Sequence, residues 1–537
     1  MNLTSHLLER ALKLPPPATR DVLVQRDVRV PMRDGAVLLA DRWAPRTGGA
    51  GLPLTLVRTP YGRRGLFSAL LARPLAERGF QVVIQSTRGG FGSGGAFNPL
   101  RCEREDGLDT VDWVRAQPWF GDAMVLFGGS YLGYVQWAMA DQLPPEVKAM
   151  VASVTESALT MEFLRADGFS LETPFNWGVM VDGQEGRFAM LRQQFTARKN
   201  LRALNTLPLN QADVAAAGHR IDYVQDILAD DATEKWAEID HSHRVADVTV
   251  PVSSIAGWFD IFLPGQLRDF RALQDAGRSP RLTVGPWPHV APAAVRIGNR
   301  ELFEFAGALA RGEEPPAREP VRLFVMGEDR WRDFPSWPPP GYDERRFHLQ
   351  PGGALAADVA GESAPDGYRY DPADPTPALG GVRMSMGAKA GSVDNTKLEA
   401  RPDVLTYTTA VLAEDVEVIG DVSAEIWFRS SLPFADVFVR LCDVDEKGRS
   451  FNVCDGLVRL TGAEETCLAN VRLWPTAYRF KRGHRIRVQV SSGAFPRFNR
   501  NPGTGEPRGT ASTLRAADQQ VFHDPAHPSA IVLPIRS

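Results

Sequence analysis

The alternation of apolar runs with helical stretches between residues 54 and 140 limits the folds open to this chain more than any other feature. Strand-like runs at 54–57, at 80–84 and in "MVLF" are each followed by a stretch whose apolar residues have helical spacing. Because parallel strands need crossover connections, this order predicts a parallel sheet with crossover helices. Before it, an Asp34-Gly35 pair between apolar stretches predicts a β-hairpin with a two-residue turn.

The rest of the chain divides into three further patterns. Polar helical stretches without clear strands fill about 160 to 245, strand-like runs return at 248–256 and 281–284, and short β-rich runs separated by Gly, Pro and Asp dominate after about 320. We therefore predict a sheet-and-helix core, a helical insertion and a separate C-terminal β-sandwich or jelly roll. The predicted bounds are 1–150 with 245–320 for the core, 151–244 for the insertion and 321–537 for the C-terminal domain.

The stretch "FGGSYLGY" has the parts of a nucleophile elbow, the turn that raises a serine above a parallel sheet. "MVLF" supplies a strand, Gly128 and Gly129 relieve crowding before Ser130, and a helical stretch follows. The closing glycine is Gly133, one residue later than in the common G-x-S-x-G pattern. A small-residue turn between a strand and a helix is therefore the alternative at this point.

A nucleophilic serine needs a histidine to accept its proton and a carboxylate to orient that histidine. In α/β-hydrolases the acid and then the histidine follow on loops after later strands. The loop after 248–256 contains "GWFDIF" with Asp260, and the loop after 281–284 contains "GPWPHVAP" with His289. Asp269 competes for the acid role but lies in an expected helix. An ordinary loop histidine and an exposed acid or helix cap are the alternatives for His289 and Asp260.

An oxyanion formed on the substrate also needs hydrogen-bond donors. One is normally the backbone N–H after the nucleophile, here that of Tyr131. The second comes from the loop after an early strand, which reads "RTPYGRRG" and offers the hydroxyl of Tyr61. Packing of the Tyr61 ring on the sheet is the alternative.

Four motifs in this order, "RTPYGR", "GGSYLGYVQW", "GWFD" and "GPWPH", followed by a β-rich C-terminal third, resemble the CocE/NonD hydrolases. This cocaine esterase-like group is allied to X-Pro dipeptidyl-peptidases and α-amino-acid ester hydrolases, and the resemblance covers nearly the whole chain. The family typically closes its elbow as G-x-S-Y-x-G, which is where Gly133 stands. The resemblance implies an α/β-hydrolase core, a helical cap formed by the insertion, and a jelly-roll domain packed against both.

The resemblance also implies a role for each candidate residue. Ser130 is the nucleophile, His289 the general base, Asp260 its orienting acid, and the Tyr61 hydroxyl with the Tyr131 N–H forms the oxyanion hole. One departure concerns "QSTRGGFGSGG": related sequences often carry an acid where this chain has Ser86, which leaves the partner of Arg88 undetermined. The glycine-rich run lacks the Lys-Ser/Thr of a phosphate-binding loop.

The residue at position 132 bears on the substrate. Amino-acid ester hydrolases of this group resemble "SYEG" at the elbow, with a glutamate that helps to hold a substrate ammonium, but here Leu132 takes that place. Phe262 and Trp177 are the aromatic candidates for an acyl pocket. We therefore expect a serine hydrolase that cleaves small, fairly apolar acyl esters through an acyl-enzyme. An amidase or X-Pro dipeptidyl-peptidase is the alternative, and a non-catalytic carbohydrate-binding protein is a remote one.

Composition limits the partners that the chain is expected to have. With 61 basic and 65 acidic side chains the formal charge is −4, without the concentrated basic field that nucleic-acid binding usually needs. No apolar window is long enough for a membrane helix and the first residues do not read as a secretory signal, so we expect a cytoplasmic protein. The four cysteines and the "HSH" at 241–243 lack the spacing of a metal site, and no cofactor or metal is expected. A homo-oligomer is left open.

Overall fold

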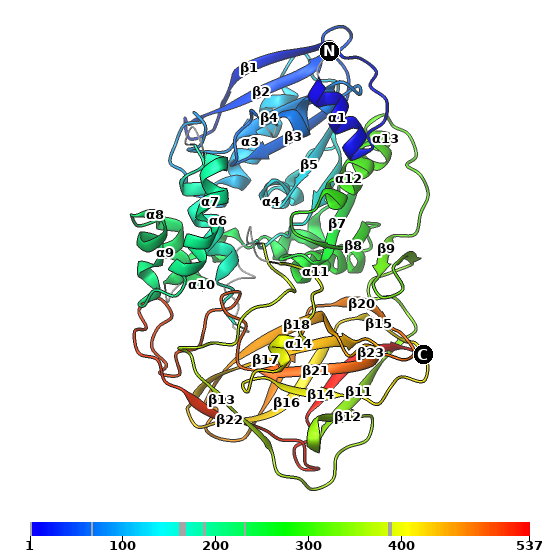
Figure 1. The fold of residues 1–537 in the computed structure, drawn as a ribbon. Helices are drawn as coiled ribbons and strands as arrows, with labels where there is room; N and C mark the ends of the chain where they lie inside the picture. The colour runs from blue at the N-terminus through cyan, green and yellow to red at the C-terminus, as the bar shows by residue number, and fades with distance from the viewer. Residues whose placement is uncertain (1–2, 66–67, 160–167, 186–188, 230–231, 385–388) are drawn as a thin grey trace.

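A ten-stranded sheet forms the core of the chain in the computed structural model, which describes residues 3–65, 68–159, 168–185, 189–229, 232–384 and 389–537 (Figure 1). Its strands lie in the order β1-β2-β4-β3-β5-β6-β7-β8-β9-β10. The run from β4 to β9 is parallel, and antiparallel pairs close both ends. The strands are β1 (Val22–Pro31), β2 (Val37–Pro45), β3 (Leu54–Thr59), β4 (Gln81–Ser86), β5 (Met124–Gly129), β6 (Val147–Ser153), β7 (Val252–Phe259), β8 (Arg281–Pro288), β9 (Val321–Val325) and β10 (Arg330–Phe334).

Helices cover both faces of this sheet, as the predicted strand–helix alternation requires. Every residue of β3, β4 and β7 is buried, as expected of central parallel strands. Alternate residues of β5 enter different clusters: Val125 and Phe127 pack with residues of α2, α12 and the following turns, whereas Met124 and Leu126 pack with α3 and α11. The core helices are α1 (Leu3–Leu12), α2 (Arg73–Ala76), α3 (Glu103–Arg115), α4 (Tyr131–Trp137), α11 (Leu263–Asp275), α12 (Pro292–Glu301) and α13 (Gly307–Ala310).

The observed core differs from the expected bounds at two places. β6 ends at Ser153, inside the segment assigned to the insertion, because its apolar residues pair with β5 and β7. β9 and β10 lie beyond residue 320 but belong to the core sheet, since β9 pairs in parallel with β8. The first hairpin forms, but residues 32–36 separate its strands instead of a two-residue turn. There Asp34 accepts hydrogen bonds from the Ala36 N–H (3.1 Å) and from Arg88 (2.7 Å).

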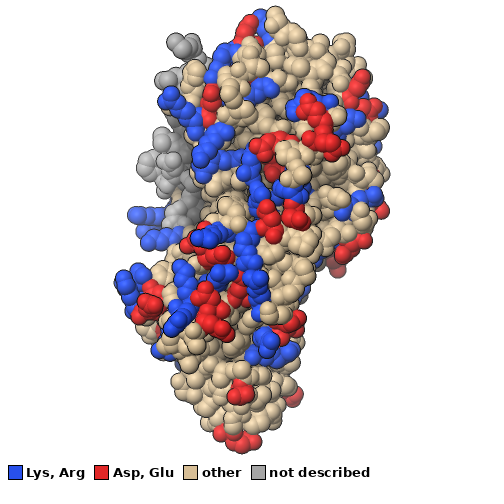
Figure 2. Space-filling model, turned by 90° about the vertical axis from the view of Figure 1, so that its right-hand side faces the viewer, with Lys and Arg blue, Asp and Glu red and all other residues tan. Residues whose placement is uncertain are grey.

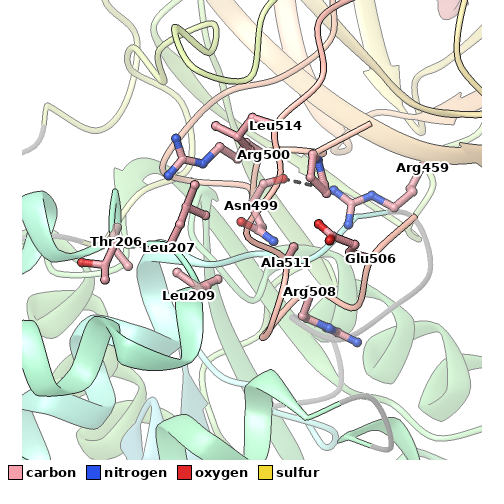
Figure 3. Close-up of a pocket in the computed structure, with 12 residues that line it drawn as sticks. Thr206, Leu207, Leu209, Arg459, Asn499, Arg500, Glu506, Arg508, Ala511 and Leu514 are labelled. Carbon is pink, nitrogen blue, oxygen red and sulfur yellow. Dashed lines mark hydrogen bonds between the residues drawn. The ribbon is translucent and has the colours of Figure 1, made fainter. Parts of the chain in front are cut away.

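The insertion between β6 and β7 is helical, as predicted, and joins the core to the C-terminal domain (Figure 1). Glu172 and Arg383 form a bidentate pair (2.8 and 2.6 Å) across one side of this contact. On another side, Arg500 donates to the carbonyl of Asn205 (3.0 Å) beside a small cavity of about 50 Å³ (Figure 3). The cap helices are α6 (Glu172–Asp182), α7 (Ala189–Ala203), α8 (Ala212–Ala217), α9 (Asp222–Leu228) and α10 (Ala232–Lys235).

The C-terminal domain is the predicted jelly roll, a thirteen-stranded sheet around its own apolar core. In its strand β21 (Arg485–Ser491), Ile486, Val488 and Val490 are fully buried, which confirms the expected alternation on that face. Gln489 is also buried, because its amide donates to Glu399 (2.8 Å). The other strands are β11 (Tyr342–Gln350), β12 (Ala354–Ala356), β13 (Asp366–Tyr370), β14 (Leu405–Thr408), β15 (Val416–Gly420), β16 (Ser423–Ser430), β17 (Phe434–Val444), β18 (Ser450–Thr461), β19 (Cys467–Arg472), β20 (Thr476–Phe480), β22 (Ala517–Val521) and β23 (Ala530–Arg536), with the short helix α14 (Thr396–Glu399).

Acidic and basic side chains are interspersed over the face of the molecule that Figure 2 presents. Within the described ranges, no helix has both the length and the apolar character needed to cross a bilayer.

Candidate active site

Ser130 stands between β5 and α4, at the carboxyl end of a central strand. Its backbone takes φ 56° and ψ −127°, a combination rare for a side-chain-bearing residue and typical of a nucleophile elbow. Two hydrogen bonds hold this conformation: the Ser130 N–H donates to the Ser153 carbonyl (2.9 Å), and the Thr155 hydroxyl donates to the Ser130 carbonyl (2.8 Å). The elbow is therefore fixed from the end of β6, the neighbouring strand.

The late glycine of the elbow has a steric cause. A Cβ at Gly133 would lie 2.3 Å from Cγ2 of Thr155, so α4 can approach the end of β6 only without a side chain there. A Cβ at Gly128 would lie 2.4 Å from Cβ of Leu132, which explains the glycine two residues before the serine. The spacing of "GGSYLGY" thus follows from the contacts of Leu132 and Thr155.

The structure brings together the three residues predicted as a triad. His289 Nε2 lies 3.0 Å from the Ser130 hydroxyl oxygen, and His289 Nδ1 lies 2.8 Å from Asp260 Oδ2. Asp260 is fully buried and its other oxygen accepts the Phe262 N–H (2.8 Å). With a proton on Nδ1 directed at Asp260, Nε2 is free to accept a proton from Ser130.

The competing acid, Asp269, is engaged elsewhere. Its two carboxylate oxygens accept the backbone N–H and the hydroxyl of Ser157, both at 2.7 Å. Arg268 also donates to it (3.0 Å). Asp269 thus links α11 to the chain that follows β6, and Asp260 is the acid at His289.

The two residues predicted for the oxyanion hole contact each other next to the serine, where the rings of Tyr61 and Tyr131 meet edge to face at 6.4 Å. The Tyr61 hydroxyl accepts the indole N–H of Trp177 (2.9 Å), and Trp177 and Ser130 both act to lower its pKa. Burial raises the pKa of Tyr61 to about 12, so its hydroxyl keeps its proton near neutral pH. Tyr131 is the first residue of α4, where a backbone N–H has no partner within the helix. Both groups are donors available for a developing oxyanion.

The side chain of Tyr131 has partners that the sequence did not indicate. Its hydroxyl donates to Glu103 (2.7 Å) and accepts the Leu100 N–H (2.7 Å). Glu103 in turn forms a buried ion pair with Arg58 (2.9 Å). Burial raises the pKa of both Glu103 and Tyr131. In the sequence, Glu103 is only one acid of the run "EREDG" at the start of a helix, but a buried tyrosine after the serine does require a polar partner.

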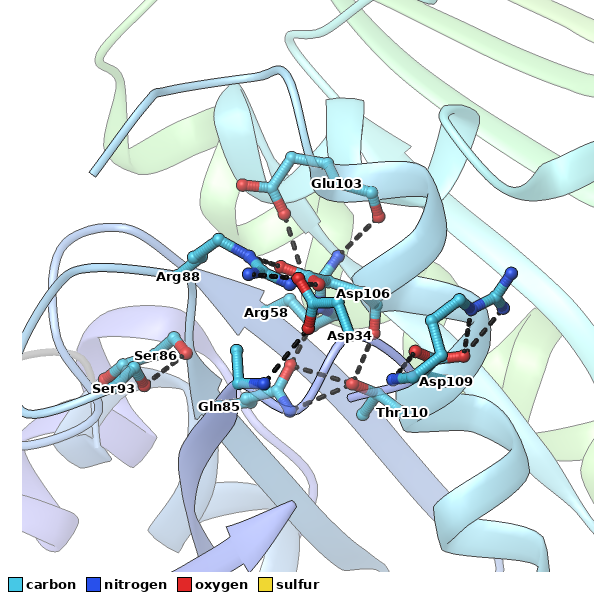
Figure 4. A network of polar contacts seen from close by, with 12 residues as sticks. Asp34, Arg58, Gln85, Ser86, Arg88, Ser93, Glu103, Asp106, Asp109 and Thr110 are labelled. Atoms are coloured by element: carbon cyan, nitrogen blue, oxygen red, sulfur yellow. Dashed lines mark hydrogen bonds and ion pairs between the residues drawn. The ribbon is translucent and has the colours of Figure 1, made fainter. Parts of the chain in front are cut away.

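This ion pair belongs to a larger polar network that also contains Arg88 and its two acidic partners (Figure 4). Arg88 binds both oxygens of Asp106 (3.0 and 2.6 Å) and one oxygen of Asp34 (2.7 Å). A Cβ at Gly95 would lie 2.8 Å from Cγ of Arg88, so the glycine-rich loop wraps closely around this side chain. Ser86, at the departure from the family pattern, accepts a hydrogen bond from Arg63 (3.2 Å). The glycine-rich loop thus packs around the Arg88 side chain and the two carboxylates that pair with it.

The two aromatic candidates for the acyl pocket both lie at the site. The ring of Phe262 meets that of His289 edge to face, with centroids 5.4 Å apart. The ring of Trp177 stacks on Tyr131 at 6.0 Å and an angle of 18°. Leu132 is buried in the apolar cluster that also contains Phe262.

The "HSH" segment offers no metal site among the residues that the structure describes. His241 is buried and its Nε2 lies 3.1 Å from the Tyr134 hydroxyl. Burial lowers the pKa of His241 to about 4.

Comparison with known proteins agrees with this architecture. Residues 34–291 match the family model of X-Pro dipeptidyl-peptidases (S15 family), and residues 316–532 match that of the X-Pro dipeptidyl-peptidase C-terminal non-catalytic domain. A solved aminopeptidase from a marine sediment Thaumarchaeota archaeon (TM-score 0.84) and a solved α-amino acid ester hydrolase (TM-score 0.80) share the fold. Each is 22% identical, over 97% of this chain and 98% of the other.

A curated relative is much closer in sequence. The cocaine esterase of Rhodococcus sp. (strain MB1 Bresler) is 34% identical to this chain over 95% of its length and 98% of the esterase. The aligned region spans the core, the cap and the jelly roll. The chain therefore belongs to the CocE/NonD family of hydrolases.

Proposed function

We propose that this chain cleaves carboxylic esters of small, fairly apolar acids through an acyl-enzyme formed on Ser130. Its relatives support the broader statement that it is a serine ester hydrolase. The observation that carries the finer proposal is the hydrogen-bonded series from Ser130 to His289 (3.0 Å) to Asp260 (2.8 Å) at a strained elbow. A non-catalytic carbohydrate-binding protein has no need of such a series.

Each residue has a defined part in the proposed reaction. Ser130 attacks the ester carbonyl while His289 Nε2 accepts its proton, and Asp260 stabilises the resulting imidazolium. The Tyr61 hydroxyl and the Tyr131 N–H donate to the oxyanion of the tetrahedral intermediate. The proton on His289 then goes to the leaving alcohol. A water molecule, deprotonated by His289, attacks the acyl-enzyme and releases the acid.

The surroundings of the serine favour an apolar acyl group without an ammonium. Phe262 and Trp177 offer aromatic surface, and Leu132 stands at the position of the ammonium-binding glutamate of amino-acid ester hydrolases. Glu172, on the same helix as Trp177, is neutralised by Arg383. A buried carboxylate already paired with a guanidinium attracts a substrate ammonium only weakly.

Turnover of p-nitrophenyl esters by Ser130→Ala tests the proposal. We expect its kcat to fall by about 10⁴-fold or more, since loss of a triad nucleophile leaves only binding and oxyanion stabilisation. Ser363→Ala is the matched control, because Ser363 also lies against a histidine, His523 (2.8 Å), but in the jelly roll. Full activity in Ser130→Ala would contradict the assignment.

The match to the X-Pro dipeptidyl-peptidase model supports one alternative, an amidase or X-Pro dipeptidyl-peptidase. Measuring kcat/KM on a short acyl p-nitrophenyl ester and on an Ala-Pro p-nitroanilide distinguishes the two substrate classes. We expect the ester to be strongly preferred. Preference for the anilide would replace the ester proposal while leaving the roles of Ser130, Asp260 and His289 intact.

A further inference from the structure

The indole N–H of Trp177 donates a hydrogen bond to the hydroxyl oxygen of Tyr61 at 2.9 Å. Trp177 comes from cap helix α6, whereas Tyr61 follows core strand β3. We propose that Trp177 is a positioning residue for the oxyanion hole, which orients and polarises the Tyr61 hydroxyl through this bond. The inference rests on the function proposed above and gives Trp177 a role beyond that of a pocket wall.

The bond determines where the proton of Tyr61 points. A phenol oxygen has one proton and accepts in the remaining directions, so a donor fixed on one side leaves the proton to point elsewhere. The Ser130 side chain is close enough to the same hydroxyl to lower its pKa, as Trp177 does, so the hydroxyl lies near the nucleophile. Accepting one hydrogen bond strengthens the bond that the same hydroxyl donates, by about 10–30%. The Tyr61 hydroxyl is therefore both oriented and a stronger donor at the site of the oxyanion.

Two neighbouring aromatic rings hold the Trp177 indole in the position from which it donates to Tyr61. One ring face stacks on Tyr131 (6.0 Å, 18°), and Tyr223 meets the ring edge to face at 4.8 Å. Tyr131 itself supplies the other expected oxyanion donor through its backbone N–H. A single cap residue therefore contacts both residues that would hold the oxyanion, one by a hydrogen bond and one by stacking.

Two roles for Trp177 make different predictions. If its ring only forms a wall of the acyl pocket, removing the ring should lower kcat by the same factor with or without the Tyr61 hydroxyl. That factor should also depend on the size of the acyl group. If it acts through Tyr61, its loss should have no effect once that hydroxyl is gone. Thermodynamic coupling between the two positions separates these cases.

The experiment is a double-mutant cycle of Trp177→Phe and Tyr61→Phe, with kcat and KM measured on one short acyl p-nitrophenyl ester. We expect Trp177→Phe to lower kcat by about 2- to 8-fold with little change in KM, because about 10–30% of a 10²- to 10³-fold oxyanion contribution is at stake. In the Tyr61→Phe background the same change should leave kcat unaltered. Equal losses in both backgrounds would overturn the proposal.

Two further proteins isolate the N–H group. Trp236→Phe is the matched control: Trp236 packs on Tyr223 in the same aromatic cluster (5.5 Å), and its indole N–H bonds to nothing among the described residues. It should leave kcat unchanged. Replacing Trp177 by benzothienylalanine keeps the ring and removes only the N–H, so it tests the bond even if Trp177→Phe folds poorly. Wild-type kcat in that protein would contradict the proposal, whereas failure of the proposed function would appear as activity in Ser130→Ala.

Discussion

Ser130 owes its strained backbone to a few neighbours rather than to its own sequence motif alone. The Ser153 carbonyl and the Thr155 hydroxyl hold the turn from the next strand, and Gly133 allows α4 to approach Thr155. The proximity of Ser130, Asp260 and His289 could be predicted, because each follows a strand whose apolar run is visible in the sequence. Thr155 and Glu103 could not, since their importance arises only from contacts made in the folded chain.

Tyr61→Phe should separate the hydroxyl from the ring. The variant keeps the edge-to-face contact with Tyr131 (6.4 Å) but loses one oxyanion donor. We expect kcat for a p-nitrophenyl ester to fall by about 10²- to 10³-fold with little change in KM. An unchanged kcat would assign Tyr61 to packing on the sheet.

Gly133→Ala should disturb the elbow without touching the triad. The added methyl would lie 2.3 Å from Cγ2 of Thr155, so the fold must shift or lose about 1–3 kcal/mol of stability. We expect a lower melting temperature together with a lower kcat. Gly361→Ala is the matched control, since a Cβ there meets nothing within 4 Å. Equal behaviour of the two variants would refute the steric account of the late glycine.

At the scale of secondary-structure elements, the carboxyl ends of β3, β5, β7 and β8 meet at one edge of the sheet and carry Tyr61, Ser130, Asp260 and His289. Their strand-like runs made this arrangement predictable, because parallel strands of an α/β core present their carboxyl ends together. The predicted bounds place the end of β6 in the insertion and β9 in the C-terminal domain, because each lies close to a change of pattern along the chain. Only their pairing with β5, β7 and β8 identifies them as core strands.

The contact between α3 and α4 should contribute to the stability of the core through Glu103. Glu103→Leu removes the acceptor of the Tyr131 hydroxyl and leaves the buried Arg58 without its carboxylate. Breaking a buried ion pair costs about 3–5 kcal/mol, so we expect a clearly lower free energy of unfolding in urea. Glu105→Leu, at an exposed position of the same helix, should have little effect. A stable Glu103→Leu protein would show that this network contributes little.

At the scale of the whole molecule, one apolar cluster joins the three parts. It contains Phe127 of the core, Phe175 of the cap and Val382 of the C-terminal region, as well as Phe262 beside His289. The order of the parts was visible in the changing sequence pattern. Their mutual contacts were not, since pairs such as Glu172 with Arg383 join residues that are 211 positions apart.

The stability of the jelly roll should depend on pH through Asp455. Burial alone would raise the pKa of this carboxyl, but Arg497 and Arg440 outweigh burial and hold the pKa below its ordinary range. Because the folded pKa is lowered, the stabilisation is present above the unfolded pKa of about 3.9 and is lost as the pH falls through the folded value. In Asp455→Asn that part of the acid destabilisation should be absent. Parallel pH profiles of unfolding for both proteins would contradict this.

The proposed chemistry depends most on Ser130 being the nucleophile. The direct measurement is reaction of the wild-type protein with a fluorophosphonate, followed by peptide mass spectrometry of the adduct. We expect one adduct, on Ser130, and none in Ser130→Ala. The jelly roll provides an internal comparison, because Ser363 and Asp366 lie 2.8 and 3.2 Å from the two nitrogens of His523. An unlabelled wild-type protein, or an adduct on Ser363 instead of Ser130, would show that Ser130 is not the nucleophile.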